Sequence, residues 1–391
     1  MHVLNSERLP IKLWLENPEA GAMKQIRNIA NLPFAFHHIA IMPDCHEGFG
    51  MPIGGVLATT ATIIPNAVGV DIGCGMCAIR TDLQQISRKK LSEIIKGIRK
   101  RVPLGFKHHP EPQDSSDMPS GHDITKMNIV AREYQSALHQ LGTLGGGNHF
   151  IEIQHGSDGY IWLMIHSGSR NIGLKVADHY NRLAGKLNEQ WGFGIYKKQQ
   201  LAYLPCDSEE GMAYLNEMNY CIDFAFANRK HMANRVAEIM HDITGCDFVA
   251  FEGNELINIA HNYAAAETHF GKKVFVHRKG ATKAGRGQWG IIPGSQGTKS
   301  YIVRGKGNPE SFESCSHGAG RAMGRKEAQR KLDLQTEKAR LDAMGILHAV
   351  RTVKDLDEAS GAYKSIDQVM EQQSDLVDIV VELQPLAVVK G

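Results

Sequence analysis

The chain has 391 residues, of which 42% are hydrophobic and 22% charged, an ordinary composition for a folded globular protein. Its 44 basic and 42 acidic side chains give a net charge of +2, so charge alone does not argue for a polyanionic partner, although a local basic patch can still serve one. Seven cysteines exclude a disulfide framework, no apolar run reaches the about 18 residues of a membrane span, and residues 1–20 lack the pattern of a signal peptide, so we expect a cytoplasmic protein with reduced thiols.

Helical and strand patterns follow one another in irregular order. Short apolar or alternating runs predict strands at residues 37–43, 159–167, 272–280 and 300–305. Helices are predicted after Ser87, over 210–243 as one long helix or two closed by Gly245, and after Ser365. The polar segment 107–123 has no period and predicts a surface loop or lid. Because the elements do not form βαβ repeats and no linker is evident, we predict a single α+β domain over residues 1–391, not a Rossmann or barrel fold.

The first chemical signature is VGVDIGCGM at residues 68–76, a glycine-rich turn that follows a predicted strand. It places Asp71 three residues before Cys74, and both side chains are good ligands for a borderline divalent metal. Cys74 and Cys77 also form a C-x-x-C, which by itself fits half a zinc site, a redox pair or a plain buried cysteine in a turn.

A second signature, LGTLGGGNHFIEI at residues 141–153, ends a glycine-rich loop in Asn148 and His149 before a strand-like run. Glycines allow backbone amides to approach a phosphate, and His149 can bind metal. Taken alone, the same pattern also fits a tight turn with a surface histidine.

Two more segments place a histidine near the end of an apolar run. In IHSGSRNIG (165–173), His166 ends a predicted strand and Arg170 follows with a side chain suited to phosphate. In IAHNYA (259–264), His261 is a further ligand candidate. Each histidine, considered singly, is equally compatible with a satisfied core residue.

The fifth segment, ESCSHGAGRAMGR at residues 313–325, is a candidate for covalent chemistry. His317 precedes Gly-Ala-Gly and a predicted helix that carries Arg321 and Arg325 in its first turns, where free N–H groups would favour a phosphate. A neutral imidazole is a competent nucleophile toward phosphorus. Residues 278–305, rich in glycine and basic side chains, predict either a nucleotide-lining loop or a solvated basic hairpin. Together the five segments fit two-metal phosphoryl or nucleotidyl transfer.

Nine segments in series carry a resemblance to a known family: PDCHEGFG (43–50), VGVDIGCGM (68–76), LGGGNHFIE (144–152), HSGSR (166–170), HNYA (261–264), RKGA (278–281), IIPGSQG (291–297), SHGAGR (316–321) and VVKG (388–391). Their order and their spread over nearly the whole chain resemble the RtcB-type RNA-splicing ligases, which join RNA 3′-phosphate and 5′-hydroxyl ends.

The resemblance implies a ligand set for two Mn²⁺ ions and a nucleophile. One ion would lie on Asp71, Cys74 and His149, and the second on Cys74, His166 and His261, with the thiolate bridging the two. His317 would attack the α-phosphate of GTP and carry GMP as a phosphoramidate. The residues that would surround the nucleotide are Asn148, His149, Phe150, Ile151, Glu152, His261, Asn262, Pro293, Gly294, Ser295, Gln296, Ser300, His317, Gly318, Ala319, Gly320 and Lys390.

The same resemblance implies the later steps and the partners. GMP would pass to an RNA 3′-phosphate, a 5′-hydroxyl would displace it, and a 2′,3′-cyclic phosphate would first be opened. Arg170, Arg321 and the helix after Ser87 are candidates for RNA phosphates, and Asp44 and His46 for the lining of the site. An archease-type activator is a partner of the kind the family implies, and we expect a monomer.

Some positions depart from the family pattern. Cys45 and Cys77 are extra thiols expected beside the site, where they would compete for Zn²⁺ or oxidise with Cys74. Gln296 stands where methionine is common, and segment 107–123 has no clear counterpart. Two alternatives stay open at this point: a two-metal phosphoesterase or nuclease that acts on RNA ends through water, and a non-catalytic RNA-binding relative, which would have lost metal ligands.

Overall fold

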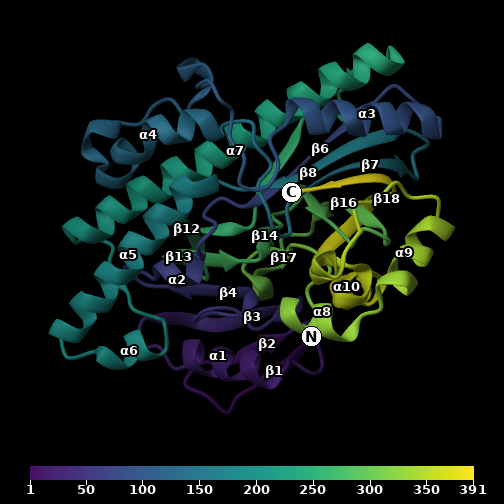
Figure 1. Cartoon of the computed structure of the whole chain (residues 1–391). Coiled ribbons are helices and arrows are strands. Elements are labelled where there is room, and N and C mark those ends of the chain that lie inside the picture. The colour runs from purple at the N-terminus through teal and green to yellow at the C-terminus, as the bar shows by residue number, and fades with distance from the viewer.

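A computed structural model describes residues 1–391 and arranges them as two large sheets with helices packed against them (Figure 1). The irregular order of helices and strands confirms the predicted α+β class. None of the helices combines the length and the apolar character that a membrane span requires.

The first sheet has six strands in the order β1-β2-β3-β4-β13-β12, of which only β2 and β3 pair in parallel. Its strands are β1 (His2–Leu4), β2 (Ile11–Leu13), β3 (Ala35–His46), β4 (Ile53–Thr59), β12 (Asn262–His269) and β13 (Lys272–Lys279). Helix α1 (Ala20–Ala30) packs on this sheet because its apolar stripe, which includes Ile26 and Ile29, shares a buried cluster with Ile39 and Leu57.

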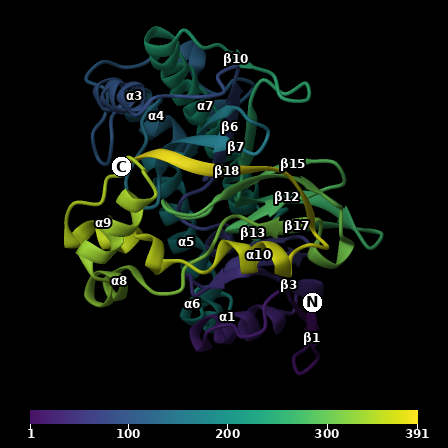
Figure 2. The same cartoon turned by 90° about the vertical axis from the view of Figure 1, so that its right-hand side faces the viewer.

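The second sheet has eight strands in the order β10-β6-β8-β7-β18-β16-β15, with β11 also paired to β6. These are β6 (Gly75–Thr81), β7 (Phe150–Gly156), β8 (Ile161–Ser167), β10 (Phe248–Val249), β11 (Ile257–Ala260), β15 (Trp289–Ile292), β16 (Ser300–Gly305) and β18 (Val377–Lys390). Two small pairs are β5 (Thr62–Ile63) with β9 (Leu204–Pro205), and β14 (Ala281–Lys283) with β17 (Ser314–Ser316). The last strand, β18, lies between β7 and β16, so Lys390 is brought opposite Phe150 (Figure 2).

The remaining helices are α2 (Pro65–Val68), α3 (Arg88–Arg101), α4 (Asn128–Gln140), α5 (Arg170–Gln190), α6 (Gly194–Lys198), α7 (Glu209–Thr244), α8 (Arg325–Lys331), α9 (Leu334–Ala343) and α10 (Ile366–Gln372). Short 3₁₀ turns are η1 (Ser115–Asp117), η2 (Ile124–Lys126), η3 (Pro309–Ser311), η4 (Val353–Glu358) and η5 (Ser360–Ala362). Helices α3 and α7 cover one face of the second sheet, where Ile94 and Val236 share a buried cluster with Ile151 and Ile165 (Figure 1).

The predicted helix ends are confirmed by their caps. The Ser87 hydroxyl accepts a hydrogen bond from the Lys90 amide at the start of α3, and Ser365 opens α10 in the same way. Residues 210–243 lie in one helix, α7, which has 36 residues and ends where Gly245 adopts the left-handed conformation. All four predicted strands are also present, within β3, β8, β13 and β16. Segment 107–123 is a largely exposed loop that contains only the turn η1.

Two local predictions are wrong. The residues that follow His317 are irregular, and the helix begins only at Arg325. Gly320 has φ +71°, which a right-handed helix does not allow. The Ala319 amide donates to the Pro293 carbonyl, so this glycine-rich segment bonds to the turn at Pro293 and forms no helix. The turn that carries Asp71 follows the short helix α2, not a strand.

Helix α7 holds together the loops that carry the ligand candidates. The buried Arg229 guanidinium donates to the carbonyls of Gly73 and Ser167, each at 2.9 Å. Its neighbour Asn228 accepts from the amides of Gly142 and Thr143. Three turns that are distant in sequence are therefore fixed to one rigid helix.

We predict that Arg229→Met lowers the free energy of unfolding by about 3 kcal/mol, because two buried carbonyls lose a charged donor. The same substitution at the exposed Lys230 is the matched control and should change it by less than about 0.5 kcal/mol. Urea unfolding of both variants measures the difference, and equal losses would contradict the role given to Arg229.

Candidate metal centre and its histidine

The candidates converge on one cavity of about 910 Å³, which is lined by residues of both large sheets. The predicted residues on its wall are Asp71, Cys74, Asn148, Phe150, Glu152, His166, His261, Asn262, Pro293, Gly294, Ser295, Gln296, His317, Gly318, Ala319, Gly320 and Lys390. Three others lie behind the wall. His149 contacts the ligand candidates there, the Ser300 hydroxyl accepts from the Gly294 amide, and Ile151 points into the apolar core on the opposite face of the sheet.

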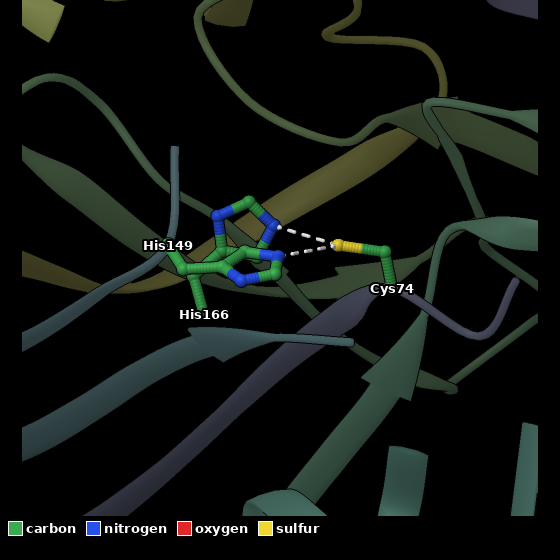
Figure 3. A group of neighbouring side chains, drawn as sticks. All are labelled: Cys74, His149 and His166. Carbon is green, nitrogen blue, oxygen red and sulfur yellow. Dashed lines mark hydrogen bonds between the residues drawn. The ribbon is translucent and has the colours of Figure 1, made fainter. Parts of the chain in front are cut away.

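Cys74, His149 and His166 form a compact buried group whose ligand atoms all lie within 4.8 Å of one another. Figure 3 shows both imidazoles turned toward the cysteine sulfur. The Cys74 Sγ lies 3.5 Å from His149 Nε2 and 3.3 Å from His166 Nε2. The three side chains come from the turn before β6, the loop before β7 and the end of β8, which are adjacent in the second sheet.

The backbone decides which nitrogen of each imidazole is free. His149 Nδ1 lies 3.0 Å from the Leu144 carbonyl oxygen, and His166 Nδ1 lies 3.1 Å from that of Asn148. Because a carbonyl can only accept, Nδ1 carries the proton and the neutral ring presents an Nε2 lone pair. Both lone pairs therefore face the Cys74 sulfur, as in a metal site whose ligands are oriented from behind.

Two further candidates complete the group. The Asp71 carboxylate lies 3.1 Å from His149 Nε2, and the ring of His261 has its centroid 5.2 Å from that of His166. His261 Nδ1 is buried and has no hydrogen-bond partner in the protein. Gly168 is needed beside Asp71, because a Cβ there would lie 2.2 Å from the carboxylate. All five predicted ligands are thus brought together.

The donor set fits a bound cation. A carboxylate, a sulfur and imidazole lone pairs meet in a buried place where the Cys74 thiol proton is the only donor among them, an arrangement that is costly unless a cation lies between them. Burial, and then the negative charge of Asp71, raise the pKa of the Cys74 thiol well above its ordinary value. Burial also acts to raise the pKa of Asp71, but contact with His149 outweighs it and holds that pKa at about 2. A divalent ion would deprotonate the thiol outright.

His317 lies next to this group, with its ring centroid 4.8 Å from that of His261. Its Nδ1 is 2.6 Å from a carboxylate oxygen of the fully buried Asp44, and its backbone amide donates to the same oxygen at 3.0 Å. Asp44 therefore fixes the ring and keeps the proton on Nδ1, which leaves Nε2 with a free lone pair. This is the arrangement of an oriented nucleophile.

The far wall of the cavity is polar and charged. Burial raises the pKa of Glu152 to about 8, against the opposing influence of Lys390 and Gln154. Lys390 pairs with Glu358 at 3.5 Å, and the same carboxylate pairs with Arg321 at 3.2 Å and Arg325 at 3.3 Å. The wall opposite the metal group therefore offers both donors and acceptors.

Two further residues that line the cavity have no role in the sequence predictions. Glu358 lies in η4, where no recognisable motif marks it. Lys279, within the RKGA segment, donates to the carbonyls of Phe49 and Asn66, and burial lowers its pKa to about 7. The RKGA motif is the one signal that could have identified Lys279.

The expectation of extra thiols beside the site is not met. Cys77 pairs with Ile165, so its side chain points to the face of the sheet away from His166 and packs in the core with Ile151. Successive side chains of a strand point to opposite faces. Cys45 packs in another apolar cluster, and burial raises its pKa to about 12.

The two arginines predicted to bind RNA are engaged with protein groups. Arg170 is half-buried behind the metal group, with its Nη1 at 3.5 Å from His149 Nδ1. Arg321 pairs with Glu358 and donates to the Met323 carbonyl at 3.0 Å. His46 lines the cavity, as expected, with Nδ1 at 3.0 Å from the Asp44 carbonyl oxygen.

Comparison with known proteins is consistent with this geometry. The family model described as "tRNA-splicing ligase RtcB" matches residues 25–127 and 111–391. The chain is 39% identical over 408 residues to the RNA-splicing ligase RtcB of Escherichia coli K12, and the alignment covers 100% of this chain and 99% of that protein. It is 32% identical over 461 residues to the tRNA-splicing ligase RtcB of Thermococcus kodakarensis, with 98% and 95% covered. It is also 32% identical to the RNA-splicing ligase RtcB of Mycobacterium bovis, with 94% and 100% covered.

The raised pKa of Glu152 predicts a pH-dependent effect of Glu152→Gln on stability. Between the unfolded pKa of 4.5 and the folded pKa of about 8, the folded state binds the extra proton, so wild-type stability falls as pH rises. The glutamine variant lacks this loss. The difference in free energy of unfolding between the variant and wild type should therefore rise in favour of the variant by about 1 kcal/mol per pH unit across this window. Above the window the difference should be constant.

Denaturant unfolding of the metal-free protein at pH 5, 6.5 and 8 measures this gain. Glu371→Gln makes the same change on the exposed side of α10 and should give a pH-independent difference. A flat difference for Glu152→Gln would mean that its carboxyl group is ionised throughout.

Proposed function

The chain belongs to the RtcB family and is an RNA ligase, and we propose that it joins RNA 3′-phosphate or 2′,3′-cyclic phosphate ends to 5′-hydroxyl ends through a guanylate carried on His317. The observation that carries the proposal is the Asp44–His317 pair, which leaves Nε2 of His317 free in a ring that packs edge-on against His261, next to the buried ligand candidates. The reaction would serve RNA splicing or repair, as the names of the relatives suggest.

We assign the metal ligands as two sets that share a thiolate. Asp71, Cys74 and His149 would hold one Mn²⁺, and Cys74, His166 and His261 the second. When bound, the ions would neutralise the charge that develops on transferring phosphates and align the reacting oxygens. A donor set this rich in sulfur and imidazole also suits Zn²⁺, so the choice of metal would depend on availability and geometry.

His317 would act first. Its Nε2 lone pair attacks the α-phosphorus of GTP, a P–N bond forms, and the bond to the leaving pyrophosphate breaks. The ring becomes cationic in this step, and the Asp44 carboxylate at Nδ1 stabilises that charge. Asp44 acts as a positioning residue because it touches only the nucleophile.

The guanylate would then activate the RNA. An oxygen of the RNA 3′-phosphate attacks the phosphorus on His317, the P–N bond breaks, and the end becomes a pyrophosphate-linked GMP. The 5′-hydroxyl attacks the RNA phosphorus, loses its proton and expels GMP. A cyclic end needs hydrolysis to the 3′-phosphate beforehand. One difficult displacement is thus divided into easier ones.

Guanine recognition is supported by the far wall of the cavity. Guanine presents two acceptors and donor N–H groups on its edges. Glu152 is buried and, with its raised pKa, carries a carboxyl proton at neutral pH. Lys390 is a half-buried cation, and the Gln296 Oε1 is a buried acceptor with no protein partner. A site lined with unpaired polar atoms discriminates strongly against bases that cannot satisfy them.

Location and partners are also part of the proposal. Seven cysteines without a disulfide, one of them at the centre of the ligand group, fit a reducing compartment such as the cytoplasm. The need for an archease-type activator and the monomeric state stay predictions.

Incubation with Mn²⁺ and GTP labelled at the α-phosphate should place an acid-labile label on the protein. His317→Ala should abolish the label, because the phosphoramidate is proposed to form on its Nε2. A label that persists in this variant would point to Lys279 or Lys390, which also line the cavity. Asp44→Asn should slow labelling by about 100-fold, since the amide neither fixes the tautomer nor stabilises the cation. The label is read on a denaturing gel before and after acid treatment.

His155→Ala is the matched control, since the exposed His155 of β7 lies outside the cavity, and it should retain the label. Failure of the metal-loaded wild type to take label from GTP or another nucleotide would contradict the proposal. Release of phosphate from RNA ends in its place would support a two-metal phosphoesterase.

A further inference from the structure

A second cavity, of about 420 Å³, adjoins the nucleotide end of the site. It is bordered by Arg99 of α3, by Arg351 in the segment after α9, and by Gly147 of the loop that carries His149. Gln296, Glu358 and Lys390 line both cavities, so the two spaces share one wall. A polymer with one end at His317 could extend from the first cavity into the second.

Two of the three cationic side chains that line this cavity have no protein partner, although three carboxylates also line it. Neither the Arg99 nor the Arg351 guanidinium forms an ion pair or a hydrogen bond, and the pKa of Arg99 is lowered by burial and by the charge of Arg351. Two unpaired guanidinium groups that repel each other across a cavity are a favourable place for an anion.

Two of the three carboxylates that line the cavity, those of Asp355 and Glu358, are already bonded to protein groups, and that of Asp357 is not. The Asp355 carboxylate accepts from the amides of Arg351 and Thr352 and from the Thr352 hydroxyl, as the cap of η4. Glu358 is shared by three cationic side chains. Burial, and then the neighbouring Glu358, raise the pKa of Asp357. None of these groups neutralises Arg99 or Arg351.

The wall between the two cavities carries an unused acceptor. Gln296 Nε2 donates to the Glu358 carbonyl at 2.9 Å, which fixes the amide orientation and leaves Oε1 buried without a partner. A buried oxygen of this kind is normally satisfied. A hydroxyl or N–H of a bound ligand would satisfy it.

Outside the cavity, the exposed face of α3 continues the positive surface. The helix carries seven basic side chains and one acidic one, and only Arg101 among the basic residues forms ion pairs. Lys96 lies one turn before Arg99 and Lys100 directly follows it. Unpaired basic side chains along one helix are the footprint of a phosphate backbone.

We propose that this second cavity and the adjoining face of α3 are the channel for the RNA strand, with Arg99 and Arg351 bound to backbone phosphates beyond the reacting end. The inference rests on the proposed function, since it takes the RNA end to lie at His317. The channel would make affinity depend on strand length, because only a strand that extends past the shared wall can reach both arginines.

Binding of single-stranded RNA with a 5′-hydroxyl and a 3′-phosphate tests the channel, at lengths of about 4 and about 16 nucleotides, with Mn²⁺ and without GTP so that no strand is joined. Arg99→Ala/Arg351→Ala should weaken binding of the long strand about tenfold and leave the short strand unchanged. The slope of log affinity against log salt for the long strand should fall by about 1.4, at about 0.7 per lost single-strand phosphate contact. Arg99→Lys/Arg351→Lys should retain most of that slope.

Lys24→Ala/Lys186→Ala removes two exposed basic side chains of α1 and α5, outside both cavities and outside α3, and is the matched control, with long-strand affinity within about twofold of wild type. Thermal unfolding of each variant confirms that it is folded. An unchanged long-strand affinity in Arg99→Ala/Arg351→Ala would overturn the channel, as would equal losses for both lengths. If inorganic pyrophosphate displaced the long and the short strand equally well from wild type but displaced neither from Arg99→Ala/Arg351→Ala, the cavity would instead be a site for a free phosphate. Wild-type labelling with GMP, measured separately, distinguishes failure of the channel from failure of the proposed function.

Discussion

The structure depends on one constraint, which is that a sulfur, a carboxylate and imidazole lone pairs converge in a buried place where the Cys74 thiol proton is the only donor among them. The Cys74 sulfur and the Nε2 atoms of His149 and His166 face one another because backbone carbonyls hold the opposite side of each ring. Asp71 adds a carboxylate to the same place. Such a group is destabilising by itself and becomes favourable only around a cation, so the chemistry of the site and the stability of the surrounding loops are linked.

The scaffold answers this constraint with rigid elements. Strands β6, β7 and β8 place their ends side by side, and α7 fixes the intervening turns through Asn228 and Arg229. His317 comes from the other part of the chain, after β17, and Asp44 at the end of β3 orients it. His317 is thus held from the first sheet and the candidate metal ligands from the second, with the cavity between them.

Much of this could be predicted from the sequence, because the candidate ligands lie in short motifs and because Asp, Cys and His are residue types that commonly bind divalent metals. Helix α7 was predictable from its lack of proline and its terminal Gly245. What failed depended on long-range contacts. The glycines after His317 bond to the Pro293 turn and form no helix, and Cys77 is turned away from the site by strand alternation. Glu358 could not be found at all, since its importance comes from three cationic side chains, none of which is near it in sequence.

The most direct test of the central claim is the number of Mn²⁺ ions bound per chain, measured by equilibrium dialysis of the purified protein. The ligand assignment predicts two ions in wild type, one in Asp71→Ala, one in His261→Ala and none in Cys74→Ala, because the thiolate belongs to both sets. Zn²⁺ under the same conditions reports whether the donor set itself prefers the softer metal. Retention of both ions by Cys74→Ala, or no ion in a folded wild type with either metal, would contradict the claim that these lone pairs exist to hold cations.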